Sequence, residues 1–303
     1  MPKVLITGIT GFLGSNIAQL LAEKNIEIVG LKRKTSDTWR CSEFFHQIDW
    51  IDIDDNGEWK TLLLEKAPTA IIHGAWIGVE AKERDNWLTQ VKNIEFFVNL
   101  LEIGRQLKLD KFIFLGSQAE YGNIDGLISE DKMSFPKNAY AANKIACLEL
   151  CKSFSDLYNI NWVWLRLFSL FGEKEDKNWL IPSMIDKMQS GKEMDFTEGK
   201  QKYAYMYVKD FSNIVYRLLF TSVSSGIYNV SSNKTHELRS LIEEIRNTIN
   251  PEFILNFGAL PYRENQSMHI EGDISKLASQ IGKIDFTDFN VALRNTINYY
   301  KSK

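Results

Sequence analysis

Three side chains that could together move a proton stand out in this chain. Tyr140 and Lys144 are four positions apart, and Ser117 precedes them. On a helix, residues four apart project from the same face. An ammonium group beside a phenol favours the phenolate, so we expect the pKa of Tyr140 to fall from about 10 toward the working range. With a serine hydroxyl to hold a carbonyl oxygen, these groups predict proton transfer to a carbonyl or from an alcohol.

A second chemical feature is the glycine-spaced segment TGITGFLG at residues 7–14, which follows a short apolar run and opens an amphipathic pattern. Glycines here allow a tight turn and a close approach of the backbone to a pyrophosphate, which binds at a helix N-terminus. The last glycine of the segment would let the helix pack closely against the strand. We therefore predict a dinucleotide site that includes Gly8, Thr10, Gly11, Phe12, Leu13 and Gly14.

These groups need a scaffold, and the first half of the chain alternates strand-like and helix-like segments. Such alternation predicts an α/β fold with a doubly wound parallel sheet of the Rossmann type and helices on both faces. We assign the dinucleotide-binding domain to residues 1–166, with a returning segment at 203–230. The predicted strands are 4–6, 26–31, 47–51, 70–72, 112–115 and 162–165. One helix is predicted to begin near residue 13, and two further helices are predicted at 87–107 and 140–158.

Beyond residue 166 the regular alternation stops. We expect residues 167–202 and 231–303 to form a smaller mixed α/β lobe that covers the carboxyl edge of the sheet and binds the substrate. Helices are predicted at 179–189, 211–220, 236–249 and 288–299, and a strand at 227–230.

The composition is that of an ordinary globular protein. The chain has 303 residues, of which 44% are hydrophobic, and a net charge of −3, so its charge does not favour nucleic acid or an anionic membrane as a partner. No apolar run reaches the ~20 residues of a membrane span, and the N-terminus does not read as a signal peptide. Three cysteines indicate neither a disulfide framework nor a metal site, and they favour a reducing cytoplasm.

Several ordered motifs resemble the extended short-chain dehydrogenase/reductase family, in the branch of NAD(P)-dependent epimerases, dehydratases and 4-ketoreductases that act on nucleotide-activated sugars. The resemblance covers most of the chain and supports the same two-lobed fold. In chain order, the segments that carry it are the TGxxGxxG turn at 7–14, Asp52-Ile53, His73-Gly74-Ala75, Asn93, Ser117–Gly122, the YxxxK pair Tyr140 and Lys144, Arg166–Gly172 and Val208-Lys209-Asp210.

The resemblance implies roles for particular residues. Lys144 would hold the nicotinamide ribose and lower the pKa of Tyr140, while Ser117 would bind the carbonyl oxygen. Relatives typically form homodimers, so a homodimer is expected. For the cofactor, the resemblance adds Asp52, Ile53, Gly74, Ala75, Trp76, Asn93, Tyr140 and Lys144 to the residues of the turn. For a nucleoside-diphosphate sugar substrate, it suggests Trp76, Ser117, Gln118, Ser169 and Arg263, of which Ser169 replaces the family's asparagine.

Charge at the end of the second predicted strand bears on the choice of cofactor. An acidic residue there would hold the adenosine ribose and repel a 2′-phosphate. This chain instead has Lys32, Arg33 and Lys34. We therefore favour NADP(H) over NAD(H), which stays open, and the preference for NADPH in turn suggests net reduction.

The residues after Ser117 narrow the chemistry. Family dehydratases have an Asp-Glu pair at the positions of Gln118 and Ala119, and bifunctional epimerase–reductases have a cysteine at the second position. Neither is present, which leaves hydride exchange coupled to proton transfer. The leading hypothesis is an NADPH-dependent 4-ketoreductase; the alternative is an NAD-dependent 4-epimerase. A non-enzymatic dinucleotide sensor is a third hypothesis, and the presence of Tyr140 and Lys144 argues against it.

Three further residues have competing interpretations. His73 ends a predicted buried strand, so a core histidine with satisfied hydrogen bonds is favoured over a catalytic one. Glu120 either contacts substrate hydroxyls or stabilises its own loop. Arg263 either contacts the nucleotide diphosphate, as the resemblance suggests, or forms a surface salt bridge.

Overall fold

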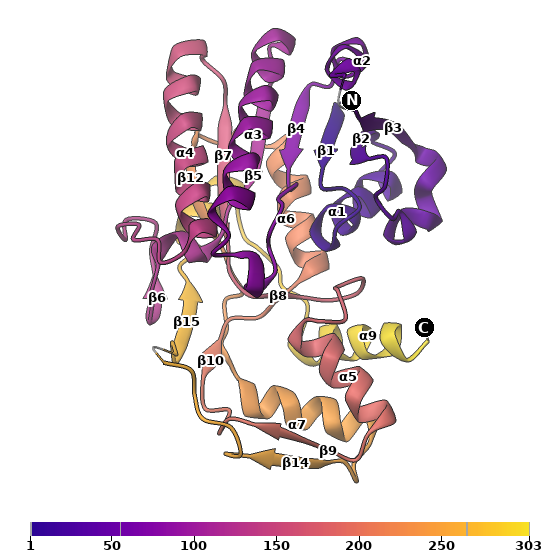
Figure 1. The fold of residues 1–303 in the computed structure, drawn as a ribbon, viewed down its shortest axis with the longest axis vertical. Helices are drawn as coiled ribbons and strands as arrows, with labels where there is room; N and C mark the ends of the chain where they lie inside the picture. Colours follow the sequence, from indigo (N-terminus) through magenta and orange to yellow (C-terminus); the bar gives the residue numbers. More distant parts are fainter. Residues whose placement is uncertain (1, 55, 265, 303) are drawn as a thin grey trace.

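A seven-stranded parallel sheet forms the centre of the larger part of the molecule (Figure 1). The computed structural model describes residues 2–54, 56–264 and 266–302. The strand order is β12-β7-β5-β4-β1-β2-β3, in which the chain moves outward from β1 in one direction and then crosses to the other side. The strands are β1 (Lys3–Thr7), β2 (Glu27–Arg33), β3 (Ile48–Ile53), β4 (Ala70–His73), β5 (Lys111–Leu115), β7 (Trp162–Leu167) and β12 (Gly226–Val230).

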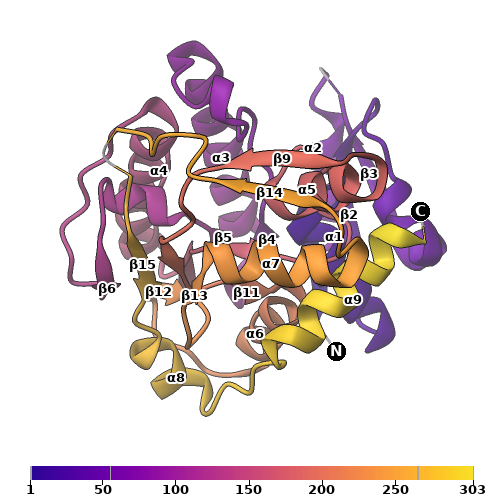
Figure 2. The ribbon, with the colours of Figure 1, turned by 90° about the horizontal axis from the view of Figure 1, so that it is seen from below.

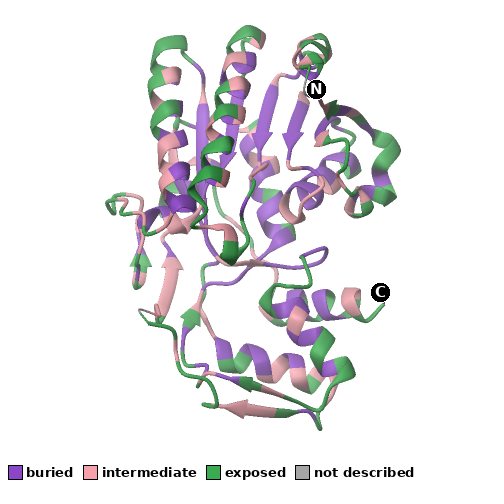
Figure 3. Cartoon of the chain, in the orientation of Figure 1, coloured by how far each residue is buried: buried purple, intermediate pink, exposed green. Residues whose placement is uncertain are grey.

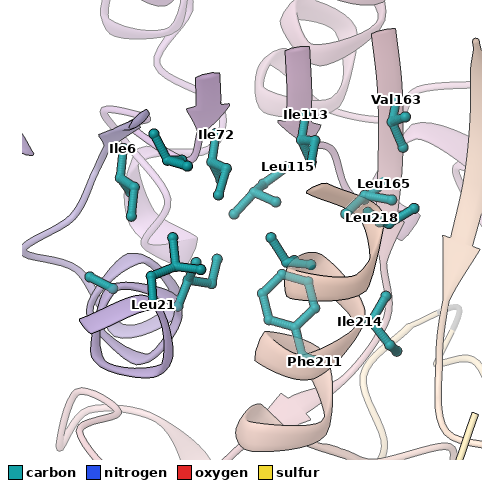
Figure 4. Close-up of a cluster of buried hydrophobic side chains, with 14 of the residues drawn as sticks. Ile6, Leu21, Ile72, Ile113, Leu115, Val163, Leu165, Phe211, Ile214 and Leu218 are labelled. Carbon is teal, nitrogen blue, oxygen red and sulfur yellow. The ribbon is translucent and has the colours of Figure 1, made fainter. Parts of the chain in front are cut away.

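Apolar side chains cover both faces of this sheet, as expected for strands that read as continuous hydrophobic runs. On one face, Ile6, Ile72 and Val163 pack against Leu21 and Phe211, from α1 (Phe12–Glu23) and α6 (Val208–Phe220) (Figure 4). The other face packs against α2 (Glu58–Lys66), α3 (Trp87–Leu107) and α4 (Ala139–Tyr158). The sheet is therefore doubly wound, as the sequence predicted.

A second, smaller core lies below the carboxyl ends of the strands, where α5, α7 and α9 cross one another (Figure 2). Buried methionine, leucine and isoleucine side chains of the three helices fill it. Parallel strands β9 and β14 lie at its outer edge in Figures 1 and 2. The elements are α5 (Leu180–Ser190), β9 (Glu193–Phe196), α7 (Leu238–Ile249), β14 (Ile254–Phe257) and α9 (Phe289–Lys301).

Short strands connect the two parts. A four-stranded sheet of order β13-β10-β15-β6 and the pair β8–β11 join segments far apart in sequence. They are β6 (Gly126–Ile128), β8 (Leu170–Phe171), β10 (Lys202–Tyr203), β11 (Met206–Tyr207), β13 (His236–Glu237) and β15 (His269–Gly272). The remaining elements are α8 (Ser275–Ile281) and the 3-10 turns η1 (Trp39–Gln47), η2 (Ala81–Glu83) and η3 (Gln118–Tyr121).

The predicted fold class is confirmed, with local differences. The helix predicted at 236–249 begins at Leu238, because His236 and Glu237 pair with β10. Helix α2 and the short strands were not predicted. β12 joins the main sheet beside β7, while the boundary at residue 166 stays a prediction. No helix in the described part of the chain has the length and apolar character that crossing a bilayer requires.

Candidate active site

A cleft of about 980 Å³ separates the sheet from the smaller core. Its size suits a dinucleotide and a second ligand, since ligand sites commonly measure ~300–1,000 Å³. Segments that follow β1, β2, β4 and β5 line one side, and residues such as Leu180, Tyr205 and Ile270 line the other. Burial is deepest along the strands above the cleft (Figure 3). The cleft thus lies at the carboxyl ends of parallel strands, the usual ligand position in this architecture.

The glycine turn after β1 is built for close backbone approach. Gly8 has φ of +71°, and a Cβ placed on it would meet Ala75 N at 2.6 Å. A Cβ on Gly14 would meet Gly8 O at 2.2 Å. Gly11 caps α1 without any side-chain hydrogen bond, so the first N–H groups of this helix are left for a ligand. This cradle fits the diphosphate of a dinucleotide.

His73 supports the turn from inside the protein. Its Nδ1 lies 2.7 Å from Thr7 Oγ1, and that oxygen also accepts a hydrogen bond from Ala75 N at 3.2 Å. Burial, with a smaller contribution from the charge of Lys144, lowers the pKa of His73 to about 3. The structure therefore shows a buried, hydrogen-bonded core histidine, as expected.

Basic side chains gather where β2 ends. Lys32, Arg33, Ser36 and Arg40 all line the cleft. Lys32 Nζ pairs with Asp52 Oδ1 at 2.5 Å, so Asp52 balances part of this positive charge. Arg33 is exposed at the rim, and Arg40 is held by bonds from Nε to Lys174 O (2.7 Å) and from Nη1 to Thr10 O (3.3 Å).

Tyr140 lies at the other end of the cleft, in the first turn of α4, and is 8% exposed. Burial raises its pKa above the ordinary value; a hydrogen bond with Ser117 and the charge of Arg84 oppose this rise. The expectation that the pKa of Tyr140 is lowered is therefore wrong for this structure, because removal from water outweighs the favourable neighbours.

Lys144 is buried one helical turn after Tyr140, but its ammonium group is directed elsewhere. Nζ donates a 2.7 Å hydrogen bond to Leu115 O and lies 3.7 Å from the centre of the Trp76 ring. The distance from Nζ to the centre of the Tyr140 ring is 5.9 Å. Burial lowers the pKa of Lys144 to about 8, although the charge of Glu120 acts in the opposite direction.

Trp76 and Asn93 shape the wall beside these groups. The Trp76 ring meets Tyr140 edge to face, with ring centres 5.9 Å apart, and its Nε1 donates to Gln90 Oε1 at 2.8 Å. Asn93 accepts a hydrogen bond from Ile77 N at 2.8 Å and returns one to Ile77 O at 3.1 Å. Asn93 therefore anchors the segment after β4 and also lines the cleft.

Ser117 is held in place by a buried ion pair below it. Its N–H donates to Glu120 Oε1 at 2.8 Å, and Glu120 Oε2 accepts from Arg166 Nε at 2.8 Å. Trp164 Nε1 also donates to Glu120 at 3.0 Å. With its carboxylate occupied by these donors, Glu120 stabilises its loop, the second of the two interpretations.

The predicted substrate residues do not all meet. Gln118 and Ser169 line the cleft together with Trp76 and Ser117. Gln118 Oε1 is buried without a hydrogen-bond partner in the described part of the chain. Arg263 is exposed and is not among the residues that line the cleft. Of the cofactor residues, Ile53, Gly74 and Ala75 line it as well, whereas Asp52 does not line the cleft and pairs with Lys32.

Comparison of this chain with known protein families identifies its family. The model of the NAD dependent epimerase/dehydratase family matches residues 4–231, which is more than half of the chain. The chain belongs to this family. The resemblance found in the sequence is thereby confirmed.

Individual members of the family are distant relatives. CDP-abequose synthase from Salmonella muenchen is 26% identical over 280 residues, or 91% of this chain and 90% of that protein. The dTDP-4-dehydro-6-deoxyglucose reductase from Escherichia coli is 24% identical over 272 residues and 84% of each chain. A crystal structure of UDP-glucuronic acid 4-epimerase from Bacillus cereus, in complex with UDP-glucuronic acid and NAD, superposes with a TM-score of 0.86 at 24% identity and 99% coverage of both chains.

Sequence reasoning missed several charged residues that line the cleft, among them Arg40, Arg84 and Glu175. None of these three belongs to a family motif that the sequence displays, and each lies in an irregular or 3-10 segment. The carboxyl oxygen Glu175 Oε2 is buried without a hydrogen-bond partner among the described residues. Burial, reinforced by Asp176, raises the pKa of Glu175 to about 8.

Proposed function

We propose that this protein reduces a 4-keto sugar of a nucleoside diphosphate to the corresponding alcohol, with NADPH as the hydride donor. The observation that carries the proposal is the convergence of Ser117, Tyr140 and Lys144 in one cleft with the glycine turn. Relatives support the reaction class, since one is named as a reductase of a dehydro-deoxyglucose nucleotide.

The chain's own residues supply the proton and the orientation. The nicotinamide supplies a hydride when it is bound. Ser117 would hydrogen-bond the carbonyl oxygen, and Tyr140 would pass its proton to that oxygen as negative charge develops there. Donors aimed at a developing oxyanion stabilise the transition state more than the ground state. Because burial raises the pKa of Tyr140, the phenol is protonated and able to act as an acid at neutral pH.

Arg33 supports NADPH as the cofactor. It lines the cleft at the end of β2, and a guanidinium group there suits the two oxygens of a 2′-phosphate. Lys32 contributes less, because Asp52 already pairs with it.

A nucleotide-sugar 4-epimerase with bound NAD is the second candidate. It is favoured by the similar fold of the UDP-glucuronic acid 4-epimerase that was solved with NAD. The ion pair between Lys32 and Asp52 also reduces the positive charge that would select a 2′-phosphate. Both reactions need the same three catalytic groups.

Reaction stoichiometry separates the two candidates. The purified protein is mixed with NADPH and a nucleoside-diphosphate 4-keto-6-deoxyhexose, and NADPH oxidation and sugar product are followed together. One NADPH consumed for each sugar reduced supports the reductase. Interconversion of 4-epimers with no net cofactor change, catalysed by protein that retains NAD through purification, supports the epimerase. If neither reaction is observed with any nucleoside-diphosphate sugar tested, both proposals fail.

We further propose a homodimer in which α3 and α4 face the partner. Both helices expose large apolar side chains, and a pair of helices from each copy would bury them. The most exposed are Leu88 at 82% and Leu157 at 75%. Light scattering of Leu157→Asp against the unchanged chain tests this, because a buried charge should dissociate the dimer. A monomeric wild-type protein would contradict it.

A further inference from the structure

Tyr140 has a second cationic neighbour besides Lys144. The guanidinium carbon of Arg84 lies 5.1 Å from the centre of the Tyr140 ring, in the range of a cation–π contact. Arg84 comes from the irregular segment between β4 and α3. It lines the cleft along with Tyr140. The contact therefore joins two elements at the catalytic group.

Arg84 is fixed at both its backbone and its side chain. Its carbonyl oxygen accepts a 2.8 Å hydrogen bond from Tyr140 N, an N–H in the first turn of α4. Its Nε donates to Val79 O at 2.9 Å, within its own segment. The backbone bond places the segment against the start of α4, while the side-chain bond orients the guanidinium group. Hydrogen bonds therefore fix the position of Arg84 beside Tyr140.

Lys144 is placed less favourably to act on the phenol. Its Nζ is 5.9 Å from the Tyr140 ring, is engaged by Leu115 O and lies over Trp76. Burial also lowers the pKa of Lys144 to about 8, so part of its charge is lost just above neutral pH. Arginine keeps its charge throughout this range. Of these two cations, Arg84 is therefore the one that is nearer the ring and keeps its charge.

Three groups from outside α4 act on the ionisation of Tyr140. Ser117 after β5 and Arg84 after β4 lower the pKa of the phenol, whereas Glu120 of η3 raises it. Lys144 shares α4 with Tyr140. Since Glu120 is paired with Arg166, its opposing influence is partly balanced. Arg84 is therefore the cation that offsets the cost of burying this phenol.

We propose that Arg84 is a positioning residue that holds Tyr140 in the cleft and stabilises the phenolate that forms when Tyr140 gives up its proton. This rests on the proposed hydride-transfer function. In the reduction, the O–H bond of Tyr140 breaks as the sugar oxygen gains that proton and the carbonyl carbon gains hydride from NADPH. The phenolate is then reprotonated from water. The positive charge of Arg84 favours the ionised phenol and so promotes proton donation to the sugar oxygen.

The test compares Arg84→Met, Arg84→Lys and a matched control. Methionine keeps length without charge, and lysine keeps the charge. Arg105 is the control, because its guanidinium lies 5.3 Å from the Tyr158 ring, in a similar contact between α3 and α4. Arg84→Met should lower kcat about tenfold with little change in KM and shift the pH–rate profile to higher pH. The control variant Arg105→Met should keep the kcat and the pH–rate profile of the unchanged protein. Arg84→Lys should recover part of the loss.

A second measurement does not depend on turnover. Carbon-13 labelling of tyrosine Cζ reports phenol ionisation by NMR, and the Tyr140→Phe variant identifies the Tyr140 signal. Titration of this signal should move to higher pH in Arg84→Met and stay in place in Arg105→Met. An unmoved titration overturns the proposal for Arg84. A shifted titration in a protein that transforms no nucleotide sugar refutes the proposed function and leaves the role of Arg84 standing.

Discussion

The two ends of the cleft are built by different means. At the dinucleotide end, the cradle consists mainly of backbone atoms. Gly8, Gly11 and Gly14 bring the chain close to where a diphosphate would bind, at the start of α1. At the catalytic end, Tyr140 is held by side chains of two segments: Trp76 and Arg84 between β4 and α3, and Ser117 after β5.

This difference has a consequence for substitution. A backbone cradle depends on the absence of side chains at its glycines, so an atom added to a glycine that faces the ligand is harmful. Most changes to side chains that point away from the ligand are tolerated. A side-chain cluster depends on the chemistry of each member, so even a substitution of similar size removes a function. The expected effects below follow from this contrast, from the largest to the smallest.

The strongest effect at the dinucleotide end is expected for Gly14→Ala. A methyl group there would overlap Gly8 O, a backbone atom that cannot move aside. Overpacking costs about 1–3 kcal/mol, which corresponds to a loss of cofactor affinity of roughly 5- to 150-fold. Titration calorimetry with NADPH measures this. Gly226→Ala, whose methyl group would make only ordinary contacts at 3.7 Å or more, should bind as before.

A smaller effect is expected for Arg33→Ala, which removes a side chain from the rim of the same end. Loss of charged hydrogen bonds to a 2′-phosphate should weaken NADPH binding about 10- to 100-fold and leave NADH binding nearly unchanged. Lys34→Ala is the matched control, because Lys34 is exposed on the same segment and does not line the cleft. Equal weakening of NADPH and NADH binding would show that Arg33 does not contact the 2′-phosphate.

The smallest effect on cofactor binding is expected at Glu175, where the change is instead in stability, because burial raises the pKa of this side chain from 4.5 to about 8. A raised folded-state pKa means that stability is fully present below about pH 4.5 and is lost as pH rises toward 8. Near pH 9 the free energy of unfolding of Glu175→Gln, measured with urea, should therefore exceed that of the wild type by about 1–4 kcal/mol. Near pH 4.5 the two free energies should match. Glu65→Gln, at an exposed position of α2, is the control, and the gain near pH 9 should be specific to Glu175→Gln. Equal stability of Glu175→Gln and wild type near pH 9 would contradict the burial effect.

The sequence predicted the scaffold well because its signals are local. The apolar runs 4–6, 70–72 and 112–115 became adjacent strands, and helix α3 has the bounds that were expected. The short strands β6 and β15 have no local signal, because they pair with each other across more than a hundred residues of sequence.

The site was predicted unevenly for the same reason. Motif residues such as Gly8, Ser117 and Tyr140 do line one cleft. The balance of charges could not be predicted, since it depends on burial and on distances between segments. Thus the sequence alone could not reveal that Arg84 approaches Tyr140, or that Asp52 pairs with Lys32.

The central claim is that the buried phenol of Tyr140 transfers a proton while hydride is exchanged at the sugar. The most direct test is single-turnover kinetics of Tyr140→Phe with NADPH and the nucleoside-diphosphate 4-keto-6-deoxyhexose, together with NADPH affinity. The account predicts a rate lower by a factor of about 10²–10⁴ with unchanged NADPH binding. Hydride transfer at the wild-type rate in Tyr140→Phe would contradict it.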